Sequence, residues 1–418
     1  MKTLLSILFL FFATYGYSQS EKLFTVDREL SNSNINQIYQ AKDGVIWIAT
    51  DDGLNRYDGA KFSIYKHKEG NDSSLVDNNV RTLFEDSKGH FLVGTQRGLQ
   101  LYNPATDLFK EIPIFYQTGE NMSAHISTIL ERKNGDLLIG TSGHGVYSLK
   151  LEGTEPVIKE AQLPVPSFFI TYLFEDQTGN LWVSTEGKGL YRIDTLNQIY
   201  HYFIGKENAW NIVTSICQDE KGNIYASNIN KGMFIYNQQE DIFTPIICST
   251  PTNLPINTIC ATEQGKVYIG TIGYGIKVYD THTQKIKESE FSFSTFDFSK
   301  ADVRAITKDK AGNLWLGINA KGVMLLPATT NQFKYMGYKS LTTNKIGSNC
   351  IKAVCKDREG TLWLGTANDG IYGIKEESKF SLHFEHKENS QSVPSTINYI
   401  HQTVDGRLWL ASPLEGLA

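Results

Sequence analysis

Residues 176–194 read DQTGNLWVSTEGKGLYRID, and this stretch contains the pattern that decides the fold. Gly179 supplies the positive φ that a hairpin turn requires, and Gly189 serves a second turn before the next strand. Trp182 and the tiny Ser184 are two positions apart, so they share one face of a strand. The small side chain leaves room there for a neighbouring sheet. The stretch therefore predicts short β-strands joined by glycine turns.

The same pattern occurs nine times along the chain. A glycine always stands three residues before the large reference residue, a tiny residue two after it, and a β-branched residue twelve before it. The reference residues, 43 to 48 positions apart, are Trp47, Leu92, Leu138, Trp182, Tyr225, Tyr268, Trp315, Trp363 and Trp409. A unit of this length with four predicted strands is typical of a propeller blade, whereas leucine-rich and β-helical repeats are shorter. The predicted fold class is therefore all-β, a β-propeller of four-stranded blades.

Nine units exceed the roughly 4 to 8 blades that close most propellers. We expect one seven-bladed ring over residues 19–339 and the start of a second propeller over residues 340–418, where the last of two repeats is truncated after Gly416. Residues 22–26 resemble the outer strand of a blade. We predict that they pair with a strand near residues 323–337 and close the first ring. On this interpretation the sequence is a fragment, and the coding frame beyond Ala418 tests it.

The N-terminus has the features of a secretory signal peptide. Lys2 precedes a short apolar run, and Gly16 and Ser18 place small residues at a cleavage site, so residues 1–18 are predicted to be removed on export. An apolar N-terminal strand is the alternative. No apolar run approaches the 18 residues typical of a membrane span. The net charge of −5, without a basic cluster, argues against nucleic-acid binding.

We predict no catalytic residue, metal site or cofactor in this chain. GTSGHG at 140–145 lies in an inter-strand turn and lacks the strand-to-helix context of a nucleophile elbow. His383 and His386 lack further metal ligands, so we interpret them as solvated. Three of the five cysteines occupy one apolar column of the repeat and are interpreted as core residues, with no disulfide assigned. The cysteines are Cys217, Cys248, Cys260, Cys350 and Cys355.

Ligand-binding residues are expected in turns that break the repeat, because loops on a rigid scaffold carry function. The aromatic residues fixed by the repeat are expected in the core. The candidates are Asp51, Asp52, Arg56, Arg97, His144, Lys188, Tyr274 and Lys321. Each has the alternative of being a solvated turn residue, and Arg56, with Asn55 and Asp58, has the further alternative of a structural role in the first blade.

The stretch 176–194 resembles the two-component regulator propeller repeat. Residues 30–59 are similar to the first blade of the periplasmic sensors of Bacteroidetes hybrid two-component systems, and DGLNRYDG at 52–59 is typical of such blades. The resemblance implies two seven-bladed propellers, a β-sandwich, a membrane helix and a histidine kinase in a homodimer that detects glycans. The sandwich, the helix and the kinase motifs are absent from this sequence, so any membrane contact would be made through segments outside it.

We therefore expect the sensing region of a signalling protein, located at the periplasmic face of the inner membrane or secreted, with an oligosaccharide as its ligand. Two alternatives stay open. One is a secreted propeller enzyme, a lyase or glycosidase acting on polysaccharide, which would need paired carboxylates or an equivalent set in the central funnel. The other is a non-catalytic scaffold that binds proteins.

Overall fold

The computed structural model describes residues 22–115, 120–151, 156–161, 163–205, 211–248, 253–289, 297–328, 346–347, 350–375, 382–385 and 392–418. The predicted signal peptide, the predicted boundary at Lys339 and His386 lie outside these residues. The chain divides into two compact units, and residues 21–290 and 298–329 form the larger one. No helix in the described ranges is long and apolar enough to cross a membrane.

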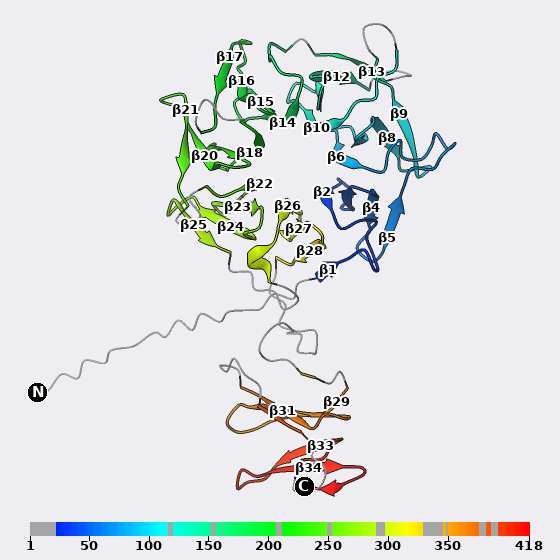
Figure 1. Ribbon diagram of the computed structural model, residues 1–418, viewed down its shortest axis with the longest axis vertical. Helices are drawn as coiled ribbons and strands as arrows, with labels where there is room; N and C mark the ends of the chain where they lie inside the picture. The colour runs from blue at the N-terminus through cyan, green and yellow to red at the C-terminus, as the bar shows by residue number, and fades with distance from the viewer. Residues whose placement is uncertain are drawn as a thin grey trace, which may run out of the picture. The chain divides into compact units, whose positions relative to one another are not determined.

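The larger unit is a closed ring of antiparallel four-stranded sheets, which we number blades 1 to 7 in chain order (Figure 1). The innermost strand of each blade contacts the innermost strand of the next, and the seventh contacts the first. The predicted fold class is confirmed.

In blades 1 to 6 the strands run in sequence order from the centre outward. Blade 1 contains β2 (Ile35–Gln40), β3 (Ile46–Thr50), β4 (Gly53–Tyr57) and β5 (Phe62–Tyr65). Blade 2 contains β6 (Val80–Glu85), β7 (Phe91–Thr95), β8 (Leu99–Asn103) and β9 (Leu108–Ile112). Blade 3 contains β10 (Ile126–Glu131), β11 (Leu137–Thr141), β12 (Val146–Lys150) and β13 (Val157–Glu160). Blade 4 contains β14 (Ile170–Glu175), β15 (Leu181–Thr185), β16 (Gly189–Ile193) and β17 (Ile199–Tyr202).

The next two blades repeat this order. Blade 5 contains β18 (Val213–Gln218), β19 (Ile224–Asn228), β20 (Gly232–Asn237) and β21 (Ile242–Ile246). Blade 6 contains β22 (Ile256–Thr262), β23 (Lys266–Thr271), β24 (Ile276–Asp280) and β25 (Lys285–Glu288), and the 3-10 helix η1 (Phe298–Lys300) precedes blade 7.

Blade 7 is completed by the N-terminal segment. Its inner three strands are β26 (Val303–Lys308), β27 (Leu314–Ile318) and β28 (Gly322–Leu326), and its fourth strand is β1 (Lys22–Phe24). Lys22 pairs with Leu325 and Phe24 with Val323 in antiparallel register. The predicted closure of the ring by residues 22–26 is therefore confirmed.

The first hairpin turn of a blade is built around the aspartate of the Asp-x-x-Gly pattern. Asp176 is buried, and its carboxylate accepts hydrogen bonds from the main-chain N–H groups of Thr178 and Asn180 and from Trp182 Nε1, all at 2.9 Å. Gly179 has a φ of 87°, which favours glycine there. The aspartate thus joins the turn to the large reference ring. Equivalent carboxylate-to-ring contacts are Asp219–Tyr225, Asp309–Trp315 and Asp357–Trp363.

The tiny column and the β-branched column pack against each other between blades. A Cβ atom added to Gly94 of blade 2 would lie 2.7 Å from Ile126 Cγ2 of blade 3. A Cβ atom at Gly317 of blade 7 would lie 2.8 Å from Ile35 Cγ2 of blade 1. The space expected beside the reference residue is therefore filled by the first strand of the following blade.

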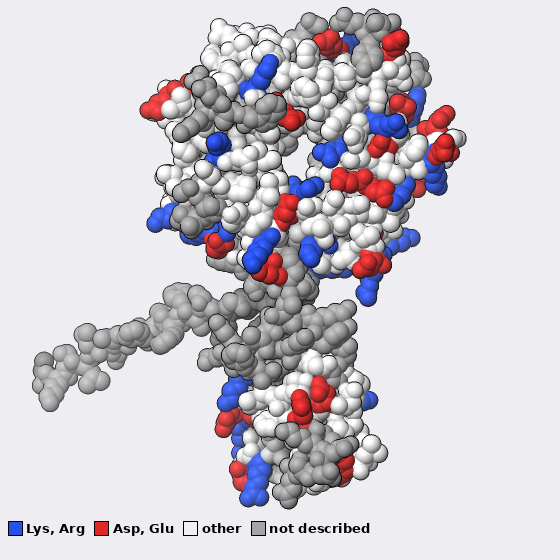
Figure 2. All heavy atoms as spheres, viewed as in Figure 1, with Lys and Arg blue, Asp and Glu red and all other residues white. Residues whose placement is uncertain are grey.

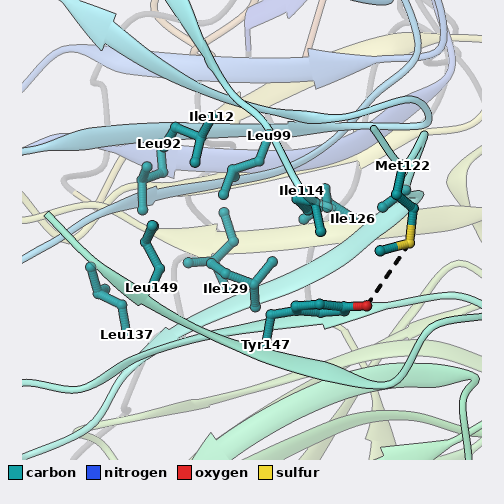
Figure 3. Close-up of a cluster of buried hydrophobic side chains, with 12 residues drawn as sticks. Leu92, Leu99, Ile112, Ile114, Met122, Ile126, Ile129, Leu137, Tyr147 and Leu149 are labelled. Carbon is teal, nitrogen blue, oxygen red and sulfur yellow. Dashed lines mark hydrogen bonds between the residues drawn. The ribbon is translucent and has the colours of Figure 1, made fainter. Parts of the chain in front are cut away.

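The core consists of apolar clusters between neighbouring sheets. Figure 3 shows the cluster between blades 2 and 3, where Ile129 lies near Leu99 and Ile126 lies beside Ile114. Tyr147 reaches the edge of this cluster, with its hydroxyl 3.9 Å from Met122 Sδ.

Aspartate–tyrosine contacts also join the outer parts of blades 4 and 5. Asp241 has a φ of 53° and accepts hydrogen bonds from Tyr202 Oη of blade 4 at 2.6 Å and from Tyr236 Oη of blade 5 at 2.5 Å. Arg192 Nη2 lies 3.2 Å from the same carboxylate oxygen. Asp107 makes the equivalent contacts with Tyr65 and Tyr102 between blades 1 and 2.

The smaller unit contains two further sheets, in agreement with two more repeats. Their strands are β29 (Ile351–Lys356), β30 (Leu362–Thr366), β31 (Ile371–Ile374) and β32 (Leu382–Phe384), then β33 (Tyr399–Gln402), β34 (Leu408–Ser412) and β35 (Gly416–Leu417). The expectation that His383 is solvated is wrong. Its ring stacks on Tyr372 with centroids 3.9 Å apart, and its Nε2 lies 2.9 Å from the carbonyl oxygen of Asp369.

Candidate ligand site at the channel mouth

The innermost strands of the seven blades surround a channel of about 830 Å³. Figure 2 shows an opening at the centre of the ring, with both basic and acidic atoms near its rim. The volume lies within the ~300–1,000 Å³ typical of ligand pockets. The channel is therefore the candidate ligand site of the ring.

A β-bulge at the start of each innermost strand determines which residue lines the channel mouth. In blade 1 the register with β3 shifts between Ile35 and Gln37, so Asn36 has no partner residue, and the other six blades have the same shift. Bulges redirect side chains and are common beside functional sites. The seven bulged residues, which we call the mouth ring, are all polar and all line the channel: Asn36, Arg81, Ser127, Thr171, Thr214, Asn257 and Arg304.

Four members of the mouth ring hydrogen-bond the next blade. Each donates to the carbonyl oxygen of the β-branched residue that begins the following inner strand. The contacts are Asn36 Nδ2 to Val80 at 2.8 Å, Thr171 Oγ1 to Val213 at 2.8 Å, Thr214 Oγ1 to Ile256 at 3.1 Å and Asn257 Nδ2 to Val303 at 3.2 Å. These hydrogen bonds connect the rim of one blade to the inner strand of the next.

Two arginines and two aspartates meet at the mouth on blades 7, 1 and 2. Arg81 Nη1 lies 3.6 Å from Asp51 Oδ1, and Arg304 Nε lies 3.8 Å from Asp302 Oδ2. The aspartates form shorter contacts with amides instead. Asn36 Nδ2 donates to Asp51 at 3.0 Å, while the amides of Asn257 and Asn319 donate to Asp302 at 2.6 and 3.0 Å.

The electrostatics of the mouth follow from partial burial and from the neighbouring arginines. Burial lowers the pKa of Arg81, Asp51 raises it and Arg304 lowers it further. Burial also lowers the pKa of His125, and the charge of Arg81 adds to this effect. The His125 imidazole is therefore neutral at pH 7 and offers one donor and one acceptor to the channel.

The deeper part of the channel is mostly apolar. Each innermost strand contributes the residue four positions after its first residue. These lining residues are Tyr39, Phe84, Leu130, Phe174, Cys217, Cys260 and Thr307. Cys217 packs against the apolar cluster between blades 5 and 6, in agreement with its interpretation as a core residue, and both Cys217 and Cys260 also line the channel. Burial raises the pKa of both thiols, which keeps them protonated at neutral pH. Neither Cys217 nor Cys260 forms a disulfide in the part of the chain that the structure describes.

Exposed aromatic side chains stand on the rim between blades 3 and 4. Phe168 and Phe169 are 66% and 51% exposed, and the Phe169 carbonyl accepts a hydrogen bond from Glu186 N at 3.0 Å. Glu186 and Ser142 line the channel beside them. The rim thus combines carboxylate, amide, guanidinium and aromatic groups.

Most of the turn residues predicted from the sequence lie on the face of the ring that carries the mouth. They occupy the turns between the second and third strands of their blades, at the ends where the inner strands begin. These residues are Asp51, Asp52, Arg97, His144, Lys188, Tyr274 and Lys321. Of these, Asp51 contacts the mouth ring directly.

The other predicted residues have local contacts or stand apart. Asp52 pairs with Lys66 at 2.6 Å, Arg97 lies 3.8 Å from Asp77, and Lys188 Nζ donates to the carbonyl of Pro166. Tyr274 is 41% exposed, Lys321 is exposed and His144 N donates to Thr141 Oγ1.

Arg56 lies on β4, away from the turns, with its guanidinium 5.9 Å from the Trp47 ring centroid. Its neighbour Asn55 is buried and bonds Ser31 and the Ile48 carbonyl. These contacts agree with the structural alternative for this part of the first blade.

The mouth ring was not among the site residues predicted from the sequence. A signal was present, because the residue after each β-branched position is polar in all seven repeats. In the described ranges no group of three or more His, Cys, Asp or Glu side chains could hold a metal ion.

Comparison with known proteins identifies the repeat. Four segments match the family model described as two component regulator propeller: residues 29–52, 74–97, 166–187 and 345–368. A curated relative, histidine kinase P4 from Formosa agariphila, is 33% identical in an alignment of 164 residues that covers 37% of this chain and 12% of that protein.

Two solved structures show the same fold. The extracellular domain of a putative hybrid two component system from B. thetaiotaomicron has a TM-score of 0.67 and 22% identity, with 96% of this chain and 53% of that chain covered. A catalytically inactive variant of virginiamycin B lyase from Staphylococcus aureus, with quinupristin, has a TM-score of 0.57 and 16% identity, with 74% and 100% covered. The chain thus spans about half of the first structure and a small part of the curated relative.

Proposed function

Because the chain carries two-component regulator propeller repeats, we propose that its seven-bladed ring is the ligand-sensing part of an extracytoplasmic signalling protein. The ligand binds at the channel mouth, and the resulting change passes to a histidine kinase domain of the full-length, homodimeric protein. The ring acts outside the cytoplasm, at the periplasmic face of the inner membrane, with a secreted protein as the alternative. The observation that carries the proposal is the mouth ring, a complete circle of polar side chains at the entrance of a ligand-sized channel.

The ligand class that fits this mouth is an oligosaccharide. Amide, carboxylate and guanidinium groups can pair with sugar hydroxyl groups in fixed directions, and the exposed faces of Phe168 and Phe169 can pack against sugar rings. Pockets of this kind combine apolar surface with a few fixed polar groups.

Ligand binding can be tested with the purified chain by thermal-shift screening against a panel of oligosaccharides. We expect one class to raise the melting temperature, and we expect Phe169→Ala to reduce that shift. Leu196→Ala is the matched control, because Leu196 is 76% exposed in the turn between β16 and β17, at the opposite end of blade 4. The absence of a shift with every glycan, or equal loss in both variants, would argue against the site.

The signalling role can be tested in the bacterium that carries the gene. Transcripts are compared between the parent strain and a strain with the gene disrupted, during growth on single polysaccharides. A sensor predicts that induction of degradation genes is lost on one polysaccharide and retained on the others. Unchanged induction on all of them would contradict the proposal.

We infer that the ring binds its ligand without converting it. The inference is supported by the mouth ring, where four side chains are engaged in hydrogen bonds to the next blade. The similarity to a lyase structure concerns the fold alone, because the sequence identity is 16%. Chromatography of oligosaccharides incubated with the chain should show unchanged species, and new unsaturated or shortened products would favour the enzyme alternative.

A further inference from the structure

The two arginines of the mouth ring belong to neighbouring blades on one side of the channel. Arg304 of blade 7, Asn36 of blade 1 and Arg81 of blade 2 are consecutive members of the ring, and we call them the basic arc. Both arginine side chains are about one third exposed, 36% for Arg81 and 37% for Arg304. Both side chains are thus accessible to a molecule in the mouth.

The guanidinium groups of the basic arc retain unused donors. Each guanidinium has five N–H donors. Within the described residues, Arg81 makes one long hydrogen bond, from Nη1 to Asn36 Oδ1 at 3.4 Å, and the nearest acid to Arg304 is 3.8 Å away. The distances from Arg81 to Asp51, 3.6 Å, and from Arg304 to Asp302, 3.8 Å, both exceed the length of a charge-assisted hydrogen bond, about 2.7–2.9 Å.

The carboxylates of the nearby aspartates accept hydrogen bonds from amides and not from the arginines. Asp51 is bonded by Asn36, and Asp302 by Asn257 and Asn319. The arginines also interact unfavourably with each other, since Arg304 lowers the pKa of Arg81. A bound anion between them would satisfy the free donors and relieve this repulsion. Neutral His125, beside Arg81, can donate one more hydrogen bond.

We propose that the basic arc binds the carboxylate of a uronic-acid unit, so that the ring recognises an acidic oligosaccharide. The proposal rests on the proposed function, because it names the chemistry of the same ligand site. The planar carboxylate matches the fork of a guanidinium group, which presents parallel N–H donors. The rest of the sugar chain would lie on the rim toward Phe168 and Phe169.

The test uses isothermal titration calorimetry of the purified chain with trimers of galacturonate, guluronate and mannuronate. The methyl ester of each trimer is the matched neutral probe, and a sulfated galactose trisaccharide is the other anionic probe. We expect one uronate to bind, its methyl ester to bind at least about tenfold more weakly, and its affinity to fall as salt rises.

Variants of the arc locate the binding. Arg81→Gln and Arg304→Gln should each weaken the uronate by about tenfold or more, and Arg81→Lys should recover part of the affinity because it keeps the charge without the fork. Arg407→Gln is the matched control, because Arg407 belongs to the smaller unit and its side chain is 77% exposed. Melting curves without ligand show that each variant is folded.

Four results would overturn the proposal: equal affinity for acid and ester, full affinity in both Gln variants, binding of the sulfated probe in place of the uronates, or no binding of any uronate. These results are distinguishable from failure of the proposed function. If a neutral oligosaccharide binds and its binding depends on Phe169, the sensing site stands but the recognition of a carboxylate is refuted. The same conclusion follows if the strain with the disrupted gene loses induction on a neutral polysaccharide.

Discussion

Replacing Phe24 with alanine should open the contact that closes the ring. Phe24 is fully buried and lies between blades 7 and 1, with ring-centroid distances of 5.9 Å to Trp315, 5.2 Å to Tyr57 and 5.0 Å to Phe62. Truncating a buried phenylalanine costs about 3–5 kcal/mol. The substitution also removes three aromatic contacts, and each contributes about 0.5–1.5 kcal/mol beyond its buried area. We therefore expect a loss of stability near the upper end of that range.

Urea unfolding followed by tryptophan fluorescence measures this loss, because Trp315 stacks directly on Phe24. A cost of about 3–5 kcal/mol is at least about a fifth of the ~5–15 kcal/mol that stabilises most domains, so the urea concentration at the unfolding midpoint should fall markedly. Val26→Ala is the control, because Val26 is two residues away and 46% exposed. A Phe24→Ala loss below about 1 kcal/mol, or a loss no greater than that of Val26→Ala, would refute the role given to β1.

Three further substitutions test other contacts of the ring. Asp176→Ala should cost about 1–3 kcal/mol in chemical denaturation, because it leaves the buried Trp182 N–H unpaired. Burial raises the pKa of Asp176, but hydrogen bonds from Trp182, Thr178 and Asn180 outweigh it and lower the pKa. The wild type should therefore lose this stability as pH falls from the unfolded value, about 3.9, through the lower folded value, and the variant should show a weaker acid dependence. Gly140→Val should lower the melting temperature by overpacking, at about 1–3 kcal/mol or more, because even its Cβ would lie 2.5 Å from Thr128 Cγ2, whereas Gly98→Ala has 3.5 Å to its nearest neighbour and should be tolerated. Asp241→Ala should cost about 1–3 kcal/mol by removing the acceptor of two tyrosine hydroxyl groups, and a melting temperature equal to wild type would contradict this.

The blade and the closure of the ring were predictable because their signals are local. The Asp-x-x-Gly turn, the tiny column and the β-branched column each report a contact that every repeat must make, as between Gly94 and Ile126. Residues 22–26 stood out because they match one strand of the same unit.

The candidate site was less predictable because it depends on a bulge. Simple alternation of side chains assigns Asn36 or Arg81 to a face of a strand, but the register shift leaves each residue unpaired at the mouth. Likewise, Cys217 and Cys260 stand in an apolar column of the repeat, which predicts a position in the core. The part of the channel wall that they form is itself apolar, so the column does not distinguish the wall from the core. The approach of Arg81 to Arg304 also required the ring to be closed, because their blades meet through blade 1.

The pairing of β1 with β28 has a consequence for how the chain is made. Lys22 and its partner Leu325 are 303 positions apart (325 − 22). At a synthesis rate of roughly 5–20 residues per second, the first strand leaves the ribosome about 15–60 s before its partner exists. During that interval blades 1 to 6 can form in order, while β1 waits with a free edge. The seventh blade therefore assembles last, from the two ends of the ring's own segment, and any factor that shields residues 22–24 until then would protect the nascent protein from pairing with the wrong strand.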